Sequence, residues 1–377
     1  MHKISPLLLL SLLVFSSCKN QNTSTRISPA TTVDSITQHQ DTISLLFVGD
    51  IMQHKAQLTA AKTPKAYDYS SYFSLIKTEI QAADLAVANL ETPIGVKPYS
   101  GYPQFSAPAE LAQATKDAGF DLLLTANNHS VDRYAKGIQR TLDILDSLDI
   151  PHLGTYRNEE ERAEHHPYLI QIKGKKLAFL NYTYGTNGLP VPPPYVVNLT
   201  DTISIKKDLE KAKEQGADLT FVCMHWGVEY DTRPSVQQQQ LAKWLISSGA
   251  DHIIGGHPHV IQPIETVEDS IRQTKHHIVY SLGNFISNMS KKDTDGGLVV
   301  KIELFETNQK QDSKVSYALV WTGRPILTKE KNFKLYPISF ERDSLNSISR
   351  NKLILFEQRA NKVLEHNSKG IEKFNFK

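Results

Sequence analysis

The sequence predicts a layered α/β sandwich, and three observations carry this prediction. Short apolar segments alternate with segments of helical spacing from Ile43 onward. The apolar segments are apolar on both faces, as expected for strands of a sheet that helices cover. After Gly255, strand-like segments follow one another with few helices between them, which indicates a second sheet packed on the first.

The individual elements follow from local patterns. Apolar runs predict strands of the first sheet at residues 43–48, 84–89, 121–125, 176–182, 219–224 and 250–254. Helical spacing predicts intervening helices at residues 72–82, 108–118, 134–148, 203–215 and 236–248. The second sheet is expected at residues 276–282, 297–304, 315–321 and 332–338. We therefore expect one domain over residues 43–340, followed by a polar C-terminal surface helix and tail over residues 341–377.

Composition excludes several classes of protein. The 377 residues include 42 Lys and Arg against 40 Asp and Glu, and 40% are hydrophobic. Such a chain is too apolar to be disordered, and it lacks the basic excess of a dedicated nucleic-acid-binding protein. Two cysteines, Cys18 and Cys223, cannot form a disulfide scaffold or a cysteine-rich zinc site. Any metal must be held by His, Asp, Glu or Asn.

The N-terminus predicts the compartment. The apolar run at residues 7–15 is shorter than the roughly 20 residues that span a bilayer, so it fits a signal peptide over residues 1–17. Two serines then precede Cys18, which resembles a bacterial lipobox, although Phe15 stands where leucine is usual. We expect lipidation of Cys18 and a flexible tether over residues 18–42, with simple secretion as the alternative. The protein would be lipid-anchored in the bacterial cell envelope, facing the periplasm or the exterior.

Polar residues able to bind metal follow the ends of five predicted strands, where open α/β sheets place their active sites. They are Asp50, then Asn89 and Glu91, then Asn127, Asn128 and His129, then His225, and finally His257 and His259. Taken singly, Asp50 could cap a helix, Glu91 could be a solvated carboxylate and Asn128 could form a turn. His225 alone could be a core histidine.

His257 and His259 are more informative, because both lie in one turn with two glycines and a proline. Mixed imidazole, carboxylate and amide ligands suit one or two divalent ions such as Mn, Zn, Fe or Ni rather than calcium. A site with open positions would lower the pKa of bound water toward about 7. His129 is placed to protonate a leaving group.

Six strings together resemble a known family. VGDIM, ANLETPIG, LLLTANNHSVDRYAKGI, HWGVEY, GADHIIGGHPHVIQPIE and YSLGNF look like the CapA family, bacterial proteins associated with capsule and poly-γ-glutamate synthesis. That family is similar to calcineurin-like metallophosphoesterases, and the resemblance implies a four-layer αββα sandwich of the metallophosphoesterase type with a dinuclear metal centre. The motifs run in family order from residue 43 to residue 285.

The resemblance also implies a ligand set in which Glu91 bridges two ions. One ion would be held by Glu91, Asn128, His225 and His257. The other would be held by Asp50, Glu91 and His259. His129 matches the proposed general acid of the family.

Two positions depart from the metallophosphoesterase pattern. Met52 stands where a ligand histidine is usual, and a thioether is a poor ligand for a hard cation. We therefore expect one strong and one weak site, with His54 as a substitute ligand. Ser130 replaces an acidic residue after His129, so an orienting carboxylate must come from elsewhere, and Asp132 is the candidate.

Two further residues, Glu229 and Asn284, receive roles from the resemblance. Glu229 could act as a catalytic acid or base or bind substrate amines, with a structural salt bridge as the alternative. Asn284 could bind substrate, with a strand-end cap as the alternative. Asn89 is a further candidate for substrate binding.

Two functions remain open from the sequence. The first is a hydrolase-type enzyme of capsule or poly-γ-glutamate synthesis, in which metal-activated hydroxide attacks phosphorus or an amide carbonyl of a cell-envelope polymer or precursor. The second is a non-catalytic accessory with a vestigial metal site, which binds the polymer or a membrane synthase. The expected partners are this polymer or precursor, the bacterial membrane through the lipid anchor, and a membrane synthase, but no nucleic acid.

Overall fold

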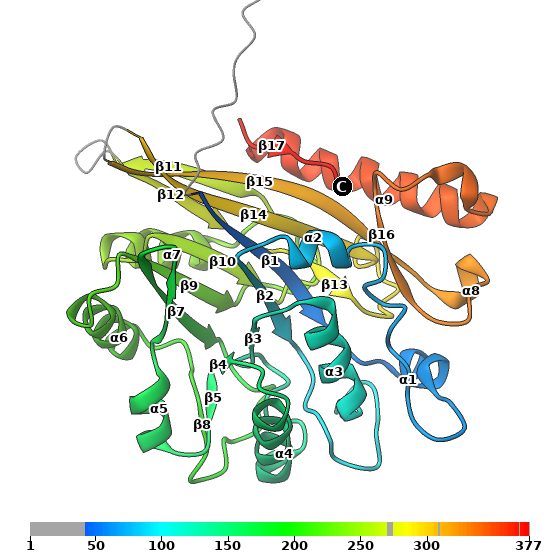
Figure 1. Cartoon of the computed structure of the whole chain (residues 1–377), viewed down its shortest axis with the longest axis horizontal. Helices are drawn as coiled ribbons and strands as arrows, with labels where there is room; N and C mark the ends of the chain where they lie inside the picture. The colour runs from blue at the N-terminus through cyan, green and yellow to red at the C-terminus, as the bar shows by residue number, and fades with distance from the viewer. Residues whose placement is uncertain (1–41, 270–273, 308–309, 369, 377) are drawn as a thin grey trace, which may run out of the picture. The chain divides into compact units, whose positions relative to one another are not determined.

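The computed structural model describes residues 42–269, 274–307, 310–368 and 370–376. The expected signal peptide, Cys18 and the tether up to residue 41 lie outside the described residues. Within the described part of the chain, two large β-sheets form the centre (Figure 1). None of the helices described there combines the length and the apolar character that crossing a membrane requires.

The larger sheet has nine strands in the described residues, and β1 (Ile43–Ile51) lies at its middle. Its main path is β16 (Lys334–Pro337), β15 (Lys310–Gly323), β14 (Gly296–Thr307), β1, β2 (Leu85–Leu90), β3 (Leu122–Leu124) and β4 (His152–Leu153). Two short strands join off this path, β13 (Asn284–Ile286) beside β1 and β17 (Glu372–Lys373) beside β15. β1 pairs in parallel with β2 and antiparallel with β14.

The second sheet has six strands in the order β11 (Ile264–Asp269), β12 (Thr274–Val279), β10 (His252–Gly256), β9 (Leu219–His225), β7 (Lys175–Thr183) and β6 (Tyr168–Ile172). Its four inner strands run parallel, and an antiparallel strand closes each edge. A separate two-stranded pair joins β5 (Thr155–Tyr156) and β8 (Val196–Val197).

The predicted membership of the two sheets was wrong, although the strands themselves are present. β14 and β15, expected in a second sheet, extend the sheet that begins with β1, with Leu45 opposite Ile302. β7, β9 and β10, expected beside β1, form the other sheet with β12. Apolar patterning shows that a strand is buried, but it does not identify the partner strand.

Helices cover the outer faces of both sheets. The nine-stranded sheet packs against α2 (Lys77–Gln81), α3 (Ala109–Ala118) and α4 (Tyr134–Ser147). The six-stranded sheet packs against α6 (Thr202–Glu214) and α7 (Val236–Ser247). Shorter helices occur at α1 (Lys55–Ala61), α5 (Glu159–His165), α8 (Pro325–Thr328) and a 3₁₀ turn (Arg342–Ser344). The arrangement confirms the predicted four-layer αββα sandwich.

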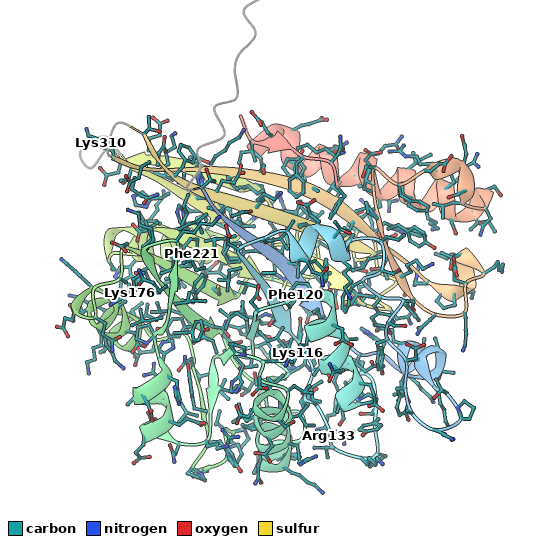
Figure 2. The ribbon with its side chains drawn as sticks, viewed as in Figure 1. Lys116, Phe120, Arg133, Lys176, Phe221 and Lys310 are labelled. Carbon is teal, nitrogen blue, oxygen red and sulfur yellow. The ribbon has the colours of Figure 1, made fainter. Side chains whose placement is uncertain are left out.

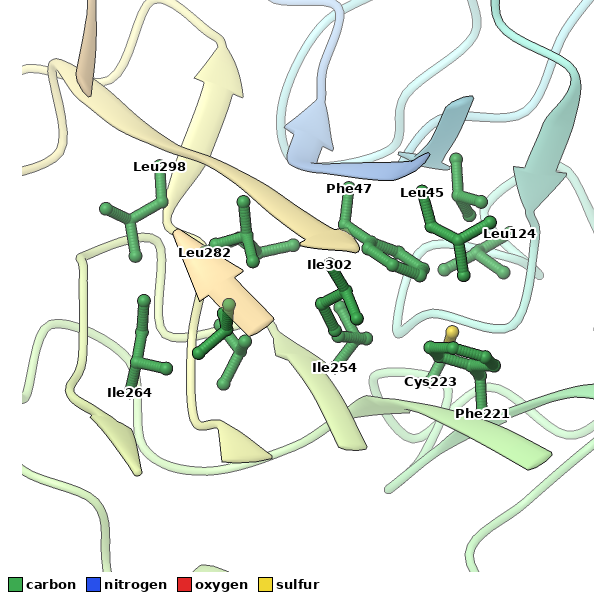
Figure 3. Packing of buried hydrophobic residues seen from close by; sticks show 14 of the residues in the cluster. Leu45, Phe47, Leu124, Phe221, Cys223, Ile254, Ile264, Leu282, Leu298 and Ile302 are labelled. Carbon is green, nitrogen blue, oxygen red and sulfur yellow. The ribbon is translucent and has the colours of Figure 1, made fainter. Parts of the chain in front are cut away.

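Apolar side chains from both sheets fill the space between them (Figure 3). The rings of Phe179 and Phe221 stack with centroids 5.0 Å apart, and Phe47 of the opposite sheet lies 5.7 Å from Phe221. Cys223 is fully buried among them, as expected for an inert thiol. Figure 2 labels Phe221 of this core and Phe120, which is also buried but packs in the cluster between the nine-stranded sheet and its helices. This core holds the two sheets in a fixed relation, which positions the strand ends described below.

The C-terminal helix α9 (Ser347–Asn367) does more than cover the surface (Figure 1). Leu353, Phe356 and Leu364 on one face are buried in the core between the sheets, beside β15 and β11. Burying such a side chain contributes about 1.5–3 kcal/mol to stability. The polar composition of residues 341–377 conceals this apolar stripe, because the other faces of the helix are solvated.

Candidate metal centre

The carboxyl ends of parallel strands from both sheets meet at one place. Asp50 and Asn89 are register partners on β1 and β2, while His225 and Gly256 are partners on β9 and β10. The Asn89 Nδ2 atom lies 3.4 Å from His225 Nδ1, so this contact joins one sheet to the other. The polar residues that sequence analysis selected at strand ends are therefore brought together.

Glu91 lies at the centre of this cluster. Its Oε1 atom is 3.9 Å from His129 Nε2, 3.8 Å from His225 Nε2 and 3.8 Å from His259 Nε2. The side chain is fully buried, and neither carboxylate oxygen has a hydrogen-bond partner among the described residues.

Such orphaned oxygens fit a cation better than they fit a structural role. A buried carboxylate that accepts no hydrogen bond is costly, and native proteins rarely retain one. Separations near 3.8 Å are too long for hydrogen bonds, but they suit pairs of ligands that each lie about 2.0–2.2 Å from a shared ion. The residues present therefore fit a divalent metal.

The two carboxylates of the cluster have opposite pKa shifts. Burial and the charge of Asp50 raise the pKa of Glu91 well above its usual value. Burial opposes ionisation of Asp50 as well, but His259, His225 and the Asn89 amide outweigh it and lower the pKa of Asp50 to about 2. Two buried carboxylates this close cannot both be charged without a compensating positive charge, which a cation would supply.

Asn284 determines which nitrogen of His259 faces the cluster. The Asn284 Nδ2 group donates to the Thr294 carbonyl oxygen at 2.9 Å, so its Oδ1 atom is the one that faces His259 Nδ1, at 3.0 Å. An amide oxygen can only accept, which leaves the proton on Nδ1 and the Nε2 lone pair directed toward Glu91. Asp50 Oδ2 also lies 3.2 Å from the same Nδ1.

Asn89 has a comparable position beside Asp50. Its Nδ2 group donates to Asp50 Oδ1 at 2.7 Å, and its Oδ1 atom accepts from Asn127 Nδ2 at 3.3 Å. The substrate-binding roles expected for Asn89 and Asn284 stay predictions. In the structure, each of these two side chains makes a hydrogen bond that orients a ligand candidate.

The second group of ligand candidates consists of Asn128, His225 and His257. His225 Nε2 lies 2.9 Å from Asn128 Oδ1, and the rings of His225 and His257 are 4.8 Å apart. The buried His257 Nδ1 atom has no hydrogen-bond partner in the described part of the chain. Burial and neighbouring histidines lower the pKa of His257 to about 4 and that of His225 well below its usual value. Both imidazoles are therefore neutral at pH 7, as metal ligation requires.

Asp132 supplies the carboxylate that Ser130 cannot. Its Oδ2 atom lies 2.7 Å from His129 Nδ1 and also accepts the Phe105 backbone N–H at 2.7 Å. This contact holds the His129 ring with its Nε2 atom toward Glu91, and the Phe105 ring packs 4.5 Å from it. The expectation that Asp132 orients His129 is confirmed.

The structure does not bring His54 into a ligand group. The groups of described residues whose ligand atoms lie within 4.8 Å of one another are Asp50 with Glu91 and His259, and Glu229 with His257 and His259. His54 Nδ1 instead lies 3.2 Å from Gln57 Oε1 and accepts the Asn288 backbone N–H at 3.3 Å.

Sequence reasoning missed one residue of the site, Tyr184. Its ring lies 4.5 Å from that of His257 and is about half exposed. Tyr184 directly follows β7, so the strand-end rule that selected the other residues also applies to it.

The turn that carries the two histidines depends on close backbone approach. A Cβ atom at Gly255 would lie 2.1 Å from the Tyr280 carbonyl oxygen, so no other residue fits there. His257 and His259 themselves have φ angles of 96° and 60°. Positive φ values in non-glycine residues are costly, and such strain is typical of functional sites.

Comparison with known proteins identifies relatives of this chain. Residues 44–289 match the family model of the bacterial capsule synthesis protein PGA_cap. The chain is 29% identical over 281 residues to the capsule biosynthesis protein CapA of Bacillus anthracis, covering 71% of this chain and 65% of that protein. It is also 29% identical over 286 residues to the PGA biosynthesis protein CapA of Bacillus subtilis, covering 71% of this chain and 69% of that protein.

A solved structure with a similar chain path is the calcineurin-like phosphoesterase YfkN from Bacillus subtilis. The TM-score is 0.40 at 13% identity, and the alignment covers 85% of this chain and 98% of the other. The family model matches well over half of the sequence and includes all the ligand candidates of the site. The chain therefore belongs to the PGA_cap family of bacterial capsule synthesis proteins.

Proposed function

We propose that this protein is a lipid-anchored envelope hydrolase of capsule or poly-γ-glutamate synthesis, with a centre for one or two divalent ions. The observation that carries the proposal is the buried Glu91 carboxylate, whose oxygens lack hydrogen bonds among the described residues and face three imidazole nitrogens. The names of the two Bacillus relatives support the biological role. The substrate would be a polymer of the cell envelope or a precursor of it.

The ligand candidates divide between two cation positions that share Glu91. Asn128, His225 and His257 would serve one position, and Asp50 with His259 the other. A bound divalent cation would polarise a phosphoryl or carbonyl oxygen and make bound water more acidic.

His129 would move a proton in the reaction. The Asp132 carboxylate lies 2.7 Å from its Nδ1 atom and fixes the orientation of the ring, so that Nε2 faces the site, where it could exchange a proton with a leaving group. The arrangement resembles a carboxylate–histidine pair in general acid catalysis, with Asp132 as the positioning residue. Phe105 excludes water from one side of the ring.

A second candidate function follows from Met52. The side chain is buried at the position where a ligand histidine would be usual, and a thioether binds hard cations weakly. In this alternative the protein is a non-catalytic accessory that binds the polymer or a membrane synthase.

Turnover of a simple phosphodiester separates the two functions. The full-length protein is assayed on bis(p-nitrophenyl) phosphate with Mn²⁺, beside His257→Ala and the control His152→Ala, whose imidazole pairs with Asp146 instead of joining the cluster. The hydrolase proposal expects turnover that His257→Ala abolishes and His152→Ala retains. Absence of turnover in a wild-type protein that binds metal would favour the accessory function.

A further inference from the structure

The ion position beside His259 has few protein ligands. Asp50, Glu91 and His259 form one of the ligand groups. Met52 stands where the resemblance stated above implies a fourth ligand. The Met52 side chain is buried, and its thioether is a poor ligand for a hard cation. A cation held by three residues here would have open positions, which water or a further side chain could fill.

Glu229 lies beside both ion positions, on the side of the histidine turn. Its carboxylate belongs to a group with His257 and His259 in which all ligand atoms lie within 4.8 Å of one another. His259 is also a member of the group with Asp50 and Glu91. The two groups share His259 and are therefore adjacent, although among the described residues Glu229 is grouped with neither Asp50 nor Glu91. The Glu229 side chain is exposed, so it would reach the ion from the solvent side.

The backbone ties Glu229 to the histidine turn. The N–H of Tyr230 donates to the Pro258 carbonyl oxygen at 2.8 Å, which links the residue after Glu229 to the residue between the two histidines. Tyr230 has a φ angle of 69°, so it shares the left-handed conformation of His257 and His259. The hydrogen bond from Tyr230 to Pro258 therefore joins two segments of strained backbone. Such strain persists only where the surrounding structure fixes the backbone, so the backbone at Glu229 is held in place.

We propose that the Glu229 carboxylate is a ligand of the ion shared by Asp50, Glu91 and His259, in place of the donor lost at Met52. The inference rests on the metal centre of the proposed function, and it replaces the acid–base role expected for Glu229. His54, the other candidate, directs its Nδ1 atom to Gln57 and Asn288.

The addition of Glu229 would change which metal the site prefers. With Glu229, one position has three carboxylates and one imidazole, a set that suits a hard cation such as Mn²⁺. The other has two imidazoles, an amide oxygen and the shared Glu91. Three carboxylates also balance most of the charge of two divalent ions, which a buried centre requires.

Titration of the metal-free, full-length protein with Mn²⁺ tests the inference, using calorimetry and the electron paramagnetic resonance of free Mn²⁺. Glu229→Gln removes the charge, and Asp231→Asn is the matched control, since Asp231 is a partly exposed carboxylate of the same loop that contacts Arg233. We expect the wild type and Asp231→Asn to bind both ions. Glu229→Gln should retain one ion at unchanged affinity and weaken the other by about tenfold or more, because even residues behind the ligands contribute about 10–100-fold.

Two results would overturn the inference, and they differ in scope. If Glu229→Gln binds two ions with wild-type affinities, Glu229 is not a ligand, while the metal centre itself stands. If the wild type binds no Mn²⁺, the proposed function and the inference fail together.

Discussion

Replacing Glu91 by glutamine distinguishes a metal ligand from a structural carboxylate. Glutamine keeps the shape of the side chain and removes its charge. If Glu91 had a structural role, its replacement would lower the stability of the protein with and without metal, because its hydrogen bonds would be lost. Glu91 has no hydrogen bonds to described residues to lose, so we expect the variant to be more stable than the wild type when metal is absent.

The magnitude follows from the burial of the carboxylate. An unsatisfied buried polar group costs about 1–3 kcal/mol, and more when it is charged. The glutamine amide is neutral but also buried, so it recovers only part of this cost, and we expect a gain of about 1–2 kcal/mol in the free energy of unfolding. In excess metal the order reverses, because the wild type gains about 2.7 kcal/mol at a metal concentration of 100 times Kd.

The pH dependence has a definite sign. Burial and the charge of Asp50 raise the folded-state pKa of Glu91 above its ordinary value of 4.5. The folded wild type therefore keeps a proton that the unfolded chain releases above that pH, and wild-type stability falls as the pH rises. The advantage of Glu91→Gln should be small at pH 5 and larger at pH 8.

Urea denaturation of both proteins, with chelator and with Mn²⁺ at each pH, measures these differences. We expect the order of the two stabilities to reverse between the chelated and the metal-loaded conditions. A Glu91→Gln protein that is less stable than the wild type in chelator at pH 8 would refute the reasoning, since Glu91 would then be stabilising without metal.

Three further predictions concern other parts of the chain. Cys18→Ser should move the protein from the membrane fraction to the soluble fraction, and unchanged membrane association on cell fractionation would contradict the lipobox interpretation. Asn284→Ala should weaken Mn²⁺ binding about tenfold by calorimetry, because His259 loses the bond that fixes its tautomer while Asp50 partly replaces it at 3.2 Å; equal affinity would remove this role. Burial lowers the pKa of His277 to about 4, so between pH 6.5 and pH 4 only the unfolded chain takes up a proton at this side chain. The contribution of His277 to the loss of stability over this range should be about 3 kcal/mol. In urea denaturation of the chelated protein, His277→Gln should reduce that loss, and an unchanged pH slope would show that His277 contributes nothing to it.

Much of the fold could be predicted because local patterns determine it. The strands expected at residues 219–224 and 250–254 correspond to β9 (Leu219–His225) and β10 (His252–Gly256). Strand pairing was not predictable, because the contact of β1 with β14 joins segments about 250 residues apart in the sequence. The burial of one face of α9 was likewise hidden, since its partner strands lie elsewhere in the chain.

In the candidate site, too, the residue types could be predicted from the sequence, whereas the tertiary contacts could not. Asp50, Glu91, His225 and the two histidines of the Gly-Gly-His-Pro-His turn could be identified from strand ends and residue type. The interactions that orient them could not, because they depend on tertiary contacts such as Asn284 with His259 and Tyr230 with Pro258. Asp132 was accessible to sequence reasoning, since it lies three residues from His129 in one turn.

The metal content of the purified full-length protein tests the central claim most directly. The protein is stripped with chelator, loaded with excess Mn²⁺ or Zn²⁺, freed of unbound metal and measured by elemental mass spectrometry, with Glu91→Ala treated in parallel. We expect about two ions per chain in the wild type and a marked loss of bound metal in Glu91→Ala. A wild-type protein that retains neither metal would contradict the account, and the cluster around Glu91 would then have to be explained without a cation.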